Sequence, residues 1–190
     1  GVLPVPEKLE QLLSVGKELE RFLEYPLSVY SGGSTSSLIL LERGTMPRGI
    51  TNLRVGEGIL IGADVTGARD IPWLHQRTMC LEAEIVEVYR KPSVPVGPVG
   101  LDAFGGEPVF EDRGERLRAI VAVGRQDVLI EGLTPEIPEA VILGGSSDHM
   151  IIDVEDVRPA PELGGILRFF PNYGAMLALS TSPYIAFDVV

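Results

Sequence analysis

The stretch from Ser31 to Gly62 holds the residues whose types and spacing could bind a phosphate. It opens with SGGSTSS, a turn that leads into a short apolar segment, and continues with Arg54 in an Arg-x-Gly motif. Backbone N–H groups and hydroxyls at the start of a helix suit a phosphate, and an arginine adds a rigid, permanently charged donor. Turns of this composition are common, so a helix-capping turn without a ligand is the alternative.

The elements around this stretch follow the order of a parallel α/β unit. Leucines at three- and four-residue spacing predict an amphipathic helix over 6–24, with Pro6 in its first turn. A strand over 27–30, a helix over 36–43 and a strand over 52–61 are expected next. Two parallel strands cannot bury both faces of a sheet, so further strands must complete this part.

The pattern changes after residue 62. Residues 63–78 are punctuated by Gly, Pro, Asp and Arg and are expected to connect two domains. Beyond them, alternation of apolar and charged residues predicts a half-buried strand over 80–89, in which Cys80 is a small buried side chain. Short strands with Gly- and Pro-rich joints favour a β barrel or sandwich, with candidates at 117–123, 128–130, 140–143, 150–154, 166–170, 175–179 and 185–189.

Composition narrows the classes of protein. The chain has 190 residues, 45% of them hydrophobic and 23% charged, as expected of a folded protein. A net charge of -11 argues against a nucleic acid or an anionic membrane surface as partner. The single cysteine excludes an internal disulfide, and no apolar run is long enough to cross a bilayer. We therefore expect a cytoplasmic protein.

Longer motifs resemble a known family. SGGSTSSLILL and MPRGITNLRVGEGILIG, together with KPSVPVGPVGLDAFG, LGGSSDHMIIDV and NYGAMLALSTSPYI, resemble alanine-racemase-like, pyridoxal-phosphate-dependent amino-acid racemases, in particular their ornithine-racemase-like branch. The resemblance implies the C-terminal portion of a (β/α)8 TIM-type barrel over 1–62, a connection over 63–78 and an all-β domain over 79–190. It also implies a head-to-tail homodimer with a small amino-acid substrate, for which this branch suggests a dibasic amino acid.

Family members carry a further N-terminal barrel half, which holds the lysine that forms the Schiff base with pyridoxal 5'-phosphate. The 190 residues contain no counterpart of that half, so the resemblance implies that it comes from a companion fragment or a missing part of the chain. The alternative is a non-catalytic cofactor- or phosphate-binding module, or an interaction β domain derived from such an enzyme.

The resemblance also assigns cofactor-binding residues. The arginine that faces the pyridine nitrogen matches Arg54, for which a surface ion pair is the alternative. A tyrosine that donates to the cofactor phosphate matches Tyr184, for which a buried core tyrosine is the alternative. The phosphate-binding turns match five further positions, although this branch usually has Asn-Ser where Ser34 and Thr35 stand: Gly33, Ser34, Thr35, Gly56 and Glu57.

The residue that exchanges a proton with the substrate opposite the lysine is left open. Alanine racemases use a tyrosine of the partner subunit, and the segment in its neighbourhood here contains Arg125 and Asp127 instead. His149 and Asp148 are further candidates, although a lone histidine is more often structural. Ser147 and Asp148 match a segment that reaches the substrate carboxylate across the dimer. No metal is expected, because the two histidines and one cysteine have no zinc-site spacing.

Overall fold

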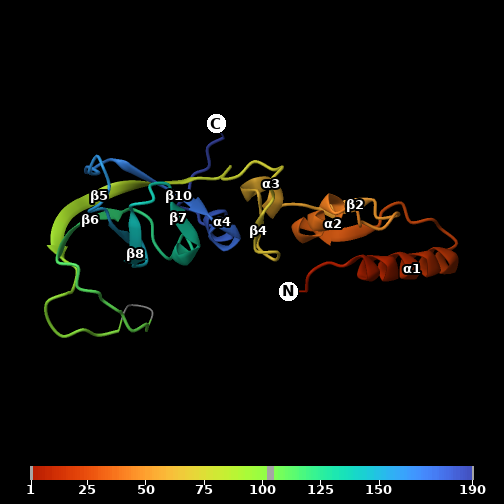
Figure 1. Cartoon of the computed structure of the whole chain (residues 1–190), viewed down its shortest axis with the longest axis horizontal. Coiled ribbons are helices and arrows are strands. Elements are labelled where there is room, and N and C mark those ends of the chain that lie inside the picture. Colours follow the sequence, from red (N-terminus) through yellow and green to blue (C-terminus); the bar gives the residue numbers. More distant parts are fainter. Residues whose placement is uncertain (1, 102–104, 190) are drawn as a thin grey trace. The chain divides into compact units, whose positions relative to one another are not determined.

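The computed structural model describes residues 2–101 and 105–189, which divide into two compact units, Gly1–Thr78 and Met79–Val190 (Figure 1). Each unit is described by itself.

The first unit begins with an 18-residue amphipathic helix, α1 (Pro6–Leu23), as the leucine spacing predicts. Pro6 stands in the first turn, and Glu24 ends the helix in the left-handed conformation with φ 51°. Gly16 faces the ring of Tyr30, and any Cβ there would clash with that ring. Only glycine at position 16 therefore lets α1 approach Tyr30 this closely.

Two short parallel strands form the centre of this unit. β1 (Ser31–Ser34) leads through the 3-10 turn Thr35–Ser37 into α2 (Leu38–Glu42), and β2 (Asn52–Arg54) leads into α3 (Glu57–Ile61). In the parallel register Ser31 pairs with Asn52 and Ser34 with Arg54. The order of strands and helices is that of a parallel α/β unit.

The predicted strand boundaries in this unit are wrong at two places. Residues 27–30 are not a strand, because the hydroxyl of Thr51 accepts from the N–H of Tyr30 at 3.0 Å and strand pairing begins only at Ser31. The expected strand over 52–61 ends at Arg54, and its apolar second half is α3. A short apolar run such as GILIG suits a strand and a helical turn equally well, so its periodicity does not distinguish the two.

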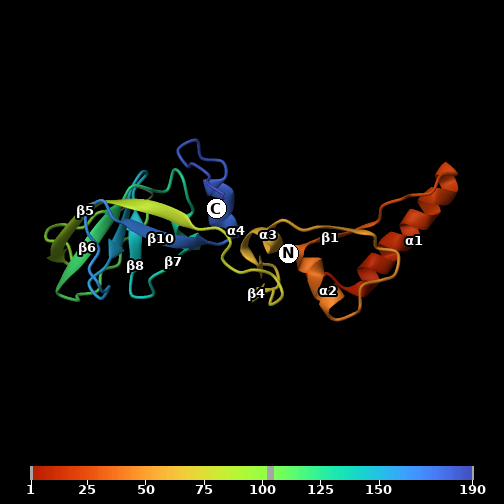
Figure 2. The ribbon, with the colours of Figure 1, turned by 90° about the horizontal axis from the view of Figure 1, so that it is seen from above.

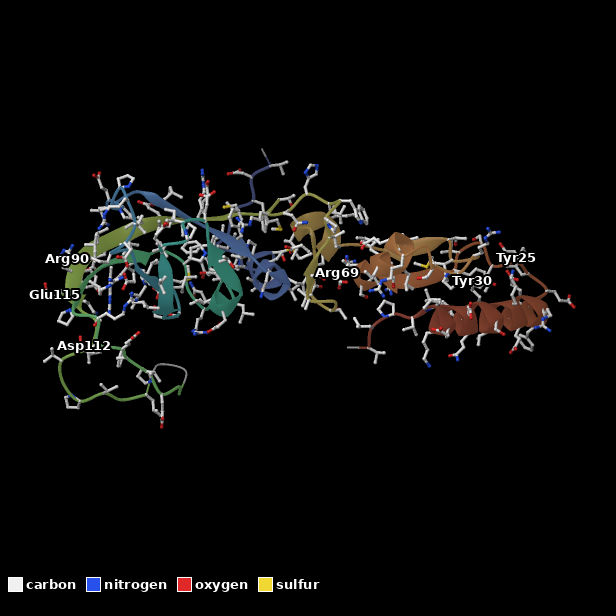
Figure 3. The ribbon with its side chains drawn as sticks, viewed as in Figure 1. Tyr25, Tyr30, Arg69, Arg90, Asp112 and Glu115 are labelled. Atoms are coloured by element: carbon white, nitrogen blue, oxygen red, sulfur yellow. The ribbon has the colours of Figure 1, made fainter. Side chains whose placement is uncertain are left out.

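The segment expected as a connection contains a small antiparallel hairpin, β3 (Ala63–Asp64) and β4 (Arg69–Asp70). Arg69 (labelled in Figure 3) donates to both carboxylate oxygens of Glu42 at 2.9 and 3.0 Å, and Trp73 Nε1 donates to the same carboxylate at 3.1 Å. This bidentate pair fastens the hairpin to α2 and lowers the pKa of Glu42, chiefly through the hydrogen bond from Arg69.

The second unit is a six-stranded antiparallel sheet with the order β7-β10-β5-β6-β9-β8, seen from a second side in Figure 2. Its long central strand is β5 (Leu81–Pro92), in which Leu81, Ala83 and Ile85 are buried and the glutamates between them exposed. The other strands are β6 (Glu115–Val121), β7 (Leu133–Pro135), β8 (Val141–Gly145), β9 (Met150–Asp153) and β10 (Ile166–Pro171).

Four other expectations for this unit are wrong. Residues 175–179 belong to a helix, α4 (Tyr173–Leu179), whose start is capped by Asn172 Oδ1 accepting from the N–H of Ala175 at 3.0 Å. Residues 128–130 enter the 3-10 turn Ile130–Gly132, and residues 185–189 form no strand. Cys80 is exposed, because pairing of β5 starts one residue later.

The core of the second unit lies between the buried face of the sheet and α4. Phe169, Met150 and Ile152 have no measurable exposure, and Ala175 and Leu179 of α4 pack into the same cluster. The amphipathic strands of this nearly closed six-stranded barrel therefore turn their apolar side to a shared interior, which α4 helps to cover.

Phe169→Ala tests this core. Removal of a fully buried aromatic ring should lower the free energy of unfolding of the second unit by about 3–5 kcal/mol, through lost burial and the cavity that remains. Phe187→Ala is the matched control, because Phe187 is 57% exposed and should change stability by less than about 0.5 kcal/mol. Denaturant unfolding measures both variants, and equal losses would contradict this description of the core.

Candidate functional site

In the first unit, the chain turns after β1 and after β2 lie at the same edge of the sheet. Carboxyl ends of parallel strands meet at one edge, where ligands of α/β folds commonly bind. Ser34 and Arg54 are direct partners in the strand register, which places their strands about 4.8 Å apart. The structure thus brings together the serine of the first turn and the arginine of the second.

A hydrogen bond joins the two turns. The hydroxyl of Thr35 accepts from the backbone N–H of Gly58 at 3.2 Å, and Thr35 is only 3% exposed. A Cβ at Gly58 would lie 3.0 Å from Thr35 Cγ2, so a side chain there would push the turns apart. Thr35 keeps its hydroxyl proton for a second partner, and Gly58 is a residue of this candidate site that sequence reasoning missed.

The first turn is held in shape by Ser37. Its hydroxyl donates to Gly32 O at 2.7 Å, and Gly33 between them has φ +111°. A Cβ at Gly33 would lie 2.7 Å from Ser37 Oγ, so both the conformation and the space require glycine. Ser37 is another residue that sequence reasoning missed, although the Ser-Gly composition of the turn was a signal for it.

The surface of this edge offers hydrogen-bond donors. Ser34, Arg54 and Gly56 are exposed, and a Cβ at Gly56 would meet nothing within 4 Å. The Arg54 guanidinium has no hydrogen bond or ion pair with residues 2–101 or 105–189, so the alternative of a surface ion pair finds no partner there. Glu57 is half-buried, and its carboxylate accepts from the N–H of Val65 at 2.9 Å, so only its backbone faces this edge as a donor. The donor set suits an anion.

In the second unit, the loop 124–127 lies against the turn 146–149, which joins β8 to β9. Arg125 N donates to Ser146 O and Gln126 N to Ser147 O, both at 2.9 Å. Gly124 packs directly on the backbone of Ser147 and Asp148, where a side chain would clash. Two segments that are distant in the sequence therefore form one cluster, here called the loop–turn cluster (residues 124–127 and 146–149).

The side chains of the turn surround one carboxylate. Asp148 Oδ1 accepts from the hydroxyl of Ser147 at 3.0 Å and from that of Ser146 at 3.3 Å, and lies 3.2 Å from His149 Nδ1. The hydrogen bond from Ser147, followed by that from His149, lowers the pKa of Asp148 below its usual 3.8. A carboxylate at Nδ1 fixes the imidazole orientation and leaves Nε2 for another partner.

Arg125 and Asp127 have different surroundings from this turn. Arg125 Nη2 forms an ion pair with Glu131 Oε1 at 2.6 Å, which lowers the pKa of Glu131. Asp127 is 5% exposed, and its Oδ1 accepts from the hydroxyl of Ser182 at 2.7 Å. Tyr184, two residues beyond Ser182, is 76% exposed, so the alternative of a core tyrosine is wrong.

Other chemistry has less support in the part of the chain that the structure describes. Residues 2–101 and 105–189 contain no group of three or more His, Cys, Asp or Glu side chains placed to hold a metal ion. No helix in these ranges is both long and apolar enough to cross a membrane.

Solved structures define the class of fold. Alanine racemase from Acinetobacter baumannii aligns over 98% of this chain and 54% of its own, with a TM-score of 0.60 and 16% identity. The predicted fold class, part of a barrel followed by a β domain, is confirmed by this likeness, and the fold of the chain is similar to that of alanine racemases.

Relatives with higher sequence identity than these solved structures are amino-acid racemases by name. Lysine racemase of Thermotoga maritima is 44% identical over 185 residues, and ornithine racemase of Acetoanaerobium sticklandii is 43% identical over 185 residues. Each alignment covers 97% of this chain but 52% of the relative, so the chain spans about half the length of the relatives it matches. No protein-family model matches the chain.

Ser147→Ala tests the electrostatics of the turn. Without the Ser147 hydroxyl, the pKa of Asp148 should rise towards 3.8, because the charged form loses its strongest hydrogen bond. Because the pKa of Asp148 is lower in the folded protein, its charged carboxylate stabilises the fold above pH 3.8, and this stabilisation is lost as pH falls through the folded pKa. The stability of the Ser147→Ala variant should therefore depend less on pH in this acidic range. An NMR titration of the Asp148 carboxyl measures the shift.

Ser146→Ala is the comparison for this titration. Its hydroxyl lies farther from the same oxygen, at 3.3 Å, and its removal should shift the Asp148 pKa less. An unchanged or lowered pKa in Ser147→Ala would contradict the assigned cause.

Proposed function

We propose that this chain is part of a pyridoxal-phosphate-dependent amino-acid racemase. The observation that carries the proposal is the pair of turns after β1 and β2, joined by the Thr35–Gly58 hydrogen bond, beside an arginine without an acidic partner in the described residues. The similarity to lysine and ornithine racemases supports the same activity.

The first unit would hold the cofactor phosphate. The backbone N–H groups of Gly33 to Thr35 and of Gly56 and Glu57, with the hydroxyls of Ser34 and Thr35, provide neutral donors at one sheet edge. Phosphate sites in TIM barrels commonly form from the loops after the last two strands, as these two turns do. Gly33 and Gly56 leave the backbone open to close approach. Tyr184 would add its hydroxyl to the phosphate.

Arg54 would face the pyridine nitrogen. Pyridoxal phosphate, when bound, supplies the electron sink that makes the Cα proton of an amino acid acidic. A guanidinium stays protonated in proteins and donates a hydrogen bond without releasing a proton, so it keeps that nitrogen unprotonated. This weaker sink favours prompt return of the proton to Cα, which is racemisation rather than transamination.

The loop–turn cluster would supply the acid/base that acts opposite the lysine. Of the four candidates, His149 meets the requirements best. Its half-buried imidazole is oriented by Asp148, and imidazole is the commonest general acid/base in enzymes. Arg125 is too basic to release a proton readily and is paired with Glu131. Asp127 is buried, and Asp148 is engaged by Ser146 and Ser147. Ser147 would lie towards the substrate carboxylate.

The rest of the enzyme would come from polypeptide outside these 190 residues, which supplies the remaining barrel strands and the lysine. The unpaired edges of the two-stranded β1–β2 sheet support this part of the proposal. We also propose a head-to-tail homodimer, in which the loop–turn cluster serves the partner's active site, and a cytoplasmic location. A dibasic amino acid is the proposed substrate, in keeping with the names of the relatives.

Arg54→Glu tests the proposed function in the assembled enzyme. A carboxyl group facing the pyridine nitrogen should favour its protonation, strengthen the electron sink and lengthen the lifetime of the deprotonated substrate. Racemisation should fall by more than about tenfold, which is a loss of only ~1.4 kcal/mol in transition-state stabilisation. A new long-wavelength absorbance should appear when substrate is added.

Arg48→Glu is the matched control, because Arg48 is exposed in the loop before β2 and changes the net charge equally. It should leave rate and spectrum as in the wild type. Unchanged rate and spectrum in Arg54→Glu would remove Arg54 from the cofactor site. Tight cofactor binding without turnover in the wild type would favour the non-catalytic binding module.

A further inference from the structure

A buried carboxylate fastens the last described segment of the second unit to the loop–turn cluster. The segment leaves α4 at Ser180 and runs through Ser182 and Tyr184. Asp127, in the loop 124–127, is 5% exposed, and its Oδ1 accepts from Ser182 Oγ at 2.7 Å. A short hydrogen bond to a buried carboxylate is among the stronger ones in proteins.

Ser182 carries the connection on to Tyr184. Its oxygen accepts from the backbone N–H of Tyr184 at 3.2 Å while its proton is donated to Asp127. The Tyr184 side chain is 76% exposed, so packing does not fix its position. Among the described residues, the hydrogen bond that the structure gives Tyr184 is this one to Ser182.

At its other end, Asp127 is part of the cluster that carries His149. Its own N–H donates to Gly124 O at 3.0 Å, and Gly124 packs on the backbone of Ser147 and Asp148. The N–H groups of the two residues before Asp127 donate to Ser146 O and Ser147 O. One continuous set of hydrogen bonds and backbone contacts thus runs from the turn 146–149 to Tyr184.

We propose that Asp127 and Ser182 are positioning residues that hold Tyr184 and the loop–turn cluster as one body. Asp127 acts through Ser182, and Ser182 acts through the backbone of Tyr184. The functional consequence rests on the proposed function, in which Tyr184 binds the cofactor phosphate and His149 moves a proton. Cofactor affinity and the placement of His149 then depend on the same buried carboxylate. This gives Asp127 a role although its carboxylate is too buried to contact a substrate.

Hydrogen exchange in the cofactor-loaded enzyme tests the connection without reference to activity. Ser182→Ala and Asp127→Ala should speed exchange of the Tyr184 amide by about five- to tenfold, as loss of a single hydrogen bond allows. Asp127→Asn keeps an oxygen acceptor for the Ser182 hydroxyl and should exchange nearly as slowly as the wild type. If Asp127→Ala fails to fold, the comparison of Ser182→Ala with Asp127→Asn still tests the connection.

Ser180→Ala is the matched control in the same segment. Its hydroxyl donates to Leu177 O within the last turn of α4, so its removal should leave exchange at Tyr184 unchanged. Equal exchange at Tyr184 in the wild type, Ser182→Ala and Ser180→Ala would overturn the proposal.

A double-mutant cycle tests whether the effect passes through Tyr184. Tyr184→Phe removes a hydrogen bond to a charged phosphate and should weaken cofactor affinity by roughly 10- to 100-fold. Ser182→Ala should weaken it by about tenfold in the wild-type background and by much less in Tyr184→Phe, because both changes remove the same contact. Full additivity of the two changes would overturn the proposed order of action.

The two readouts separate failure of this proposal from failure of the proposed function. If Tyr184→Phe leaves cofactor affinity unchanged, the phosphate role of Tyr184 fails, and the exchange data alone decide whether the connection exists. If Asp127→Asn abolishes turnover while exchange and cofactor affinity stay as in the wild type, Asp127 is a proton-transfer residue and the positioning role is overturned.

Discussion

The parallel pairing of β1 with β2 is the constraint on which the proposed site depends. It sets Ser34 beside Arg54 and brings the two following turns to one edge. The same pairing leaves a sheet of two strands, which cannot bury both of its faces. The proposed phosphate site at two adjacent strand ends and the proposed further barrel strands therefore both follow from this one pairing.

Glycine contacts set how closely the elements of each unit approach. In the first unit, Gly58 allows its N–H to reach the hydroxyl of Thr35, and Gly33 leaves room for the hydroxyl of Ser37. In the second unit, Gly124 lets the loop 124–127 lie on the backbone of the turn 146–149. In each case a side chain would separate polar groups that the proposed chemistry requires to be close.

The sequence predicted what local patterns determine. The leucine spacing located α1, and alternation located β5, because both report which face of one element is buried. The strand predicted over 175–179 is wrong, since its apolar run suits either structure and the cap by Asn172 that starts a helix is seen only in the structure. The loop–turn cluster could be anticipated only as separate candidates. The bonds of Arg125 and Gln126 to Ser146 and Ser147, and of Asp127 to Ser182, depend on how the sheet folds.

The most direct test of the central claim follows deuterium at Cα. L-lysine or L-ornithine is incubated in D2O with the cofactor-loaded enzyme. The two enantiomers are then separated, and the deuterium content of each is measured by mass spectrometry. Two different groups acting on opposite faces should give a D-enantiomer that carries deuterium while the remaining L-enantiomer stays largely protonated at early times. Absence of deuterium from both enantiomers of both amino acids would contradict the assignment of this chain to an amino-acid racemase.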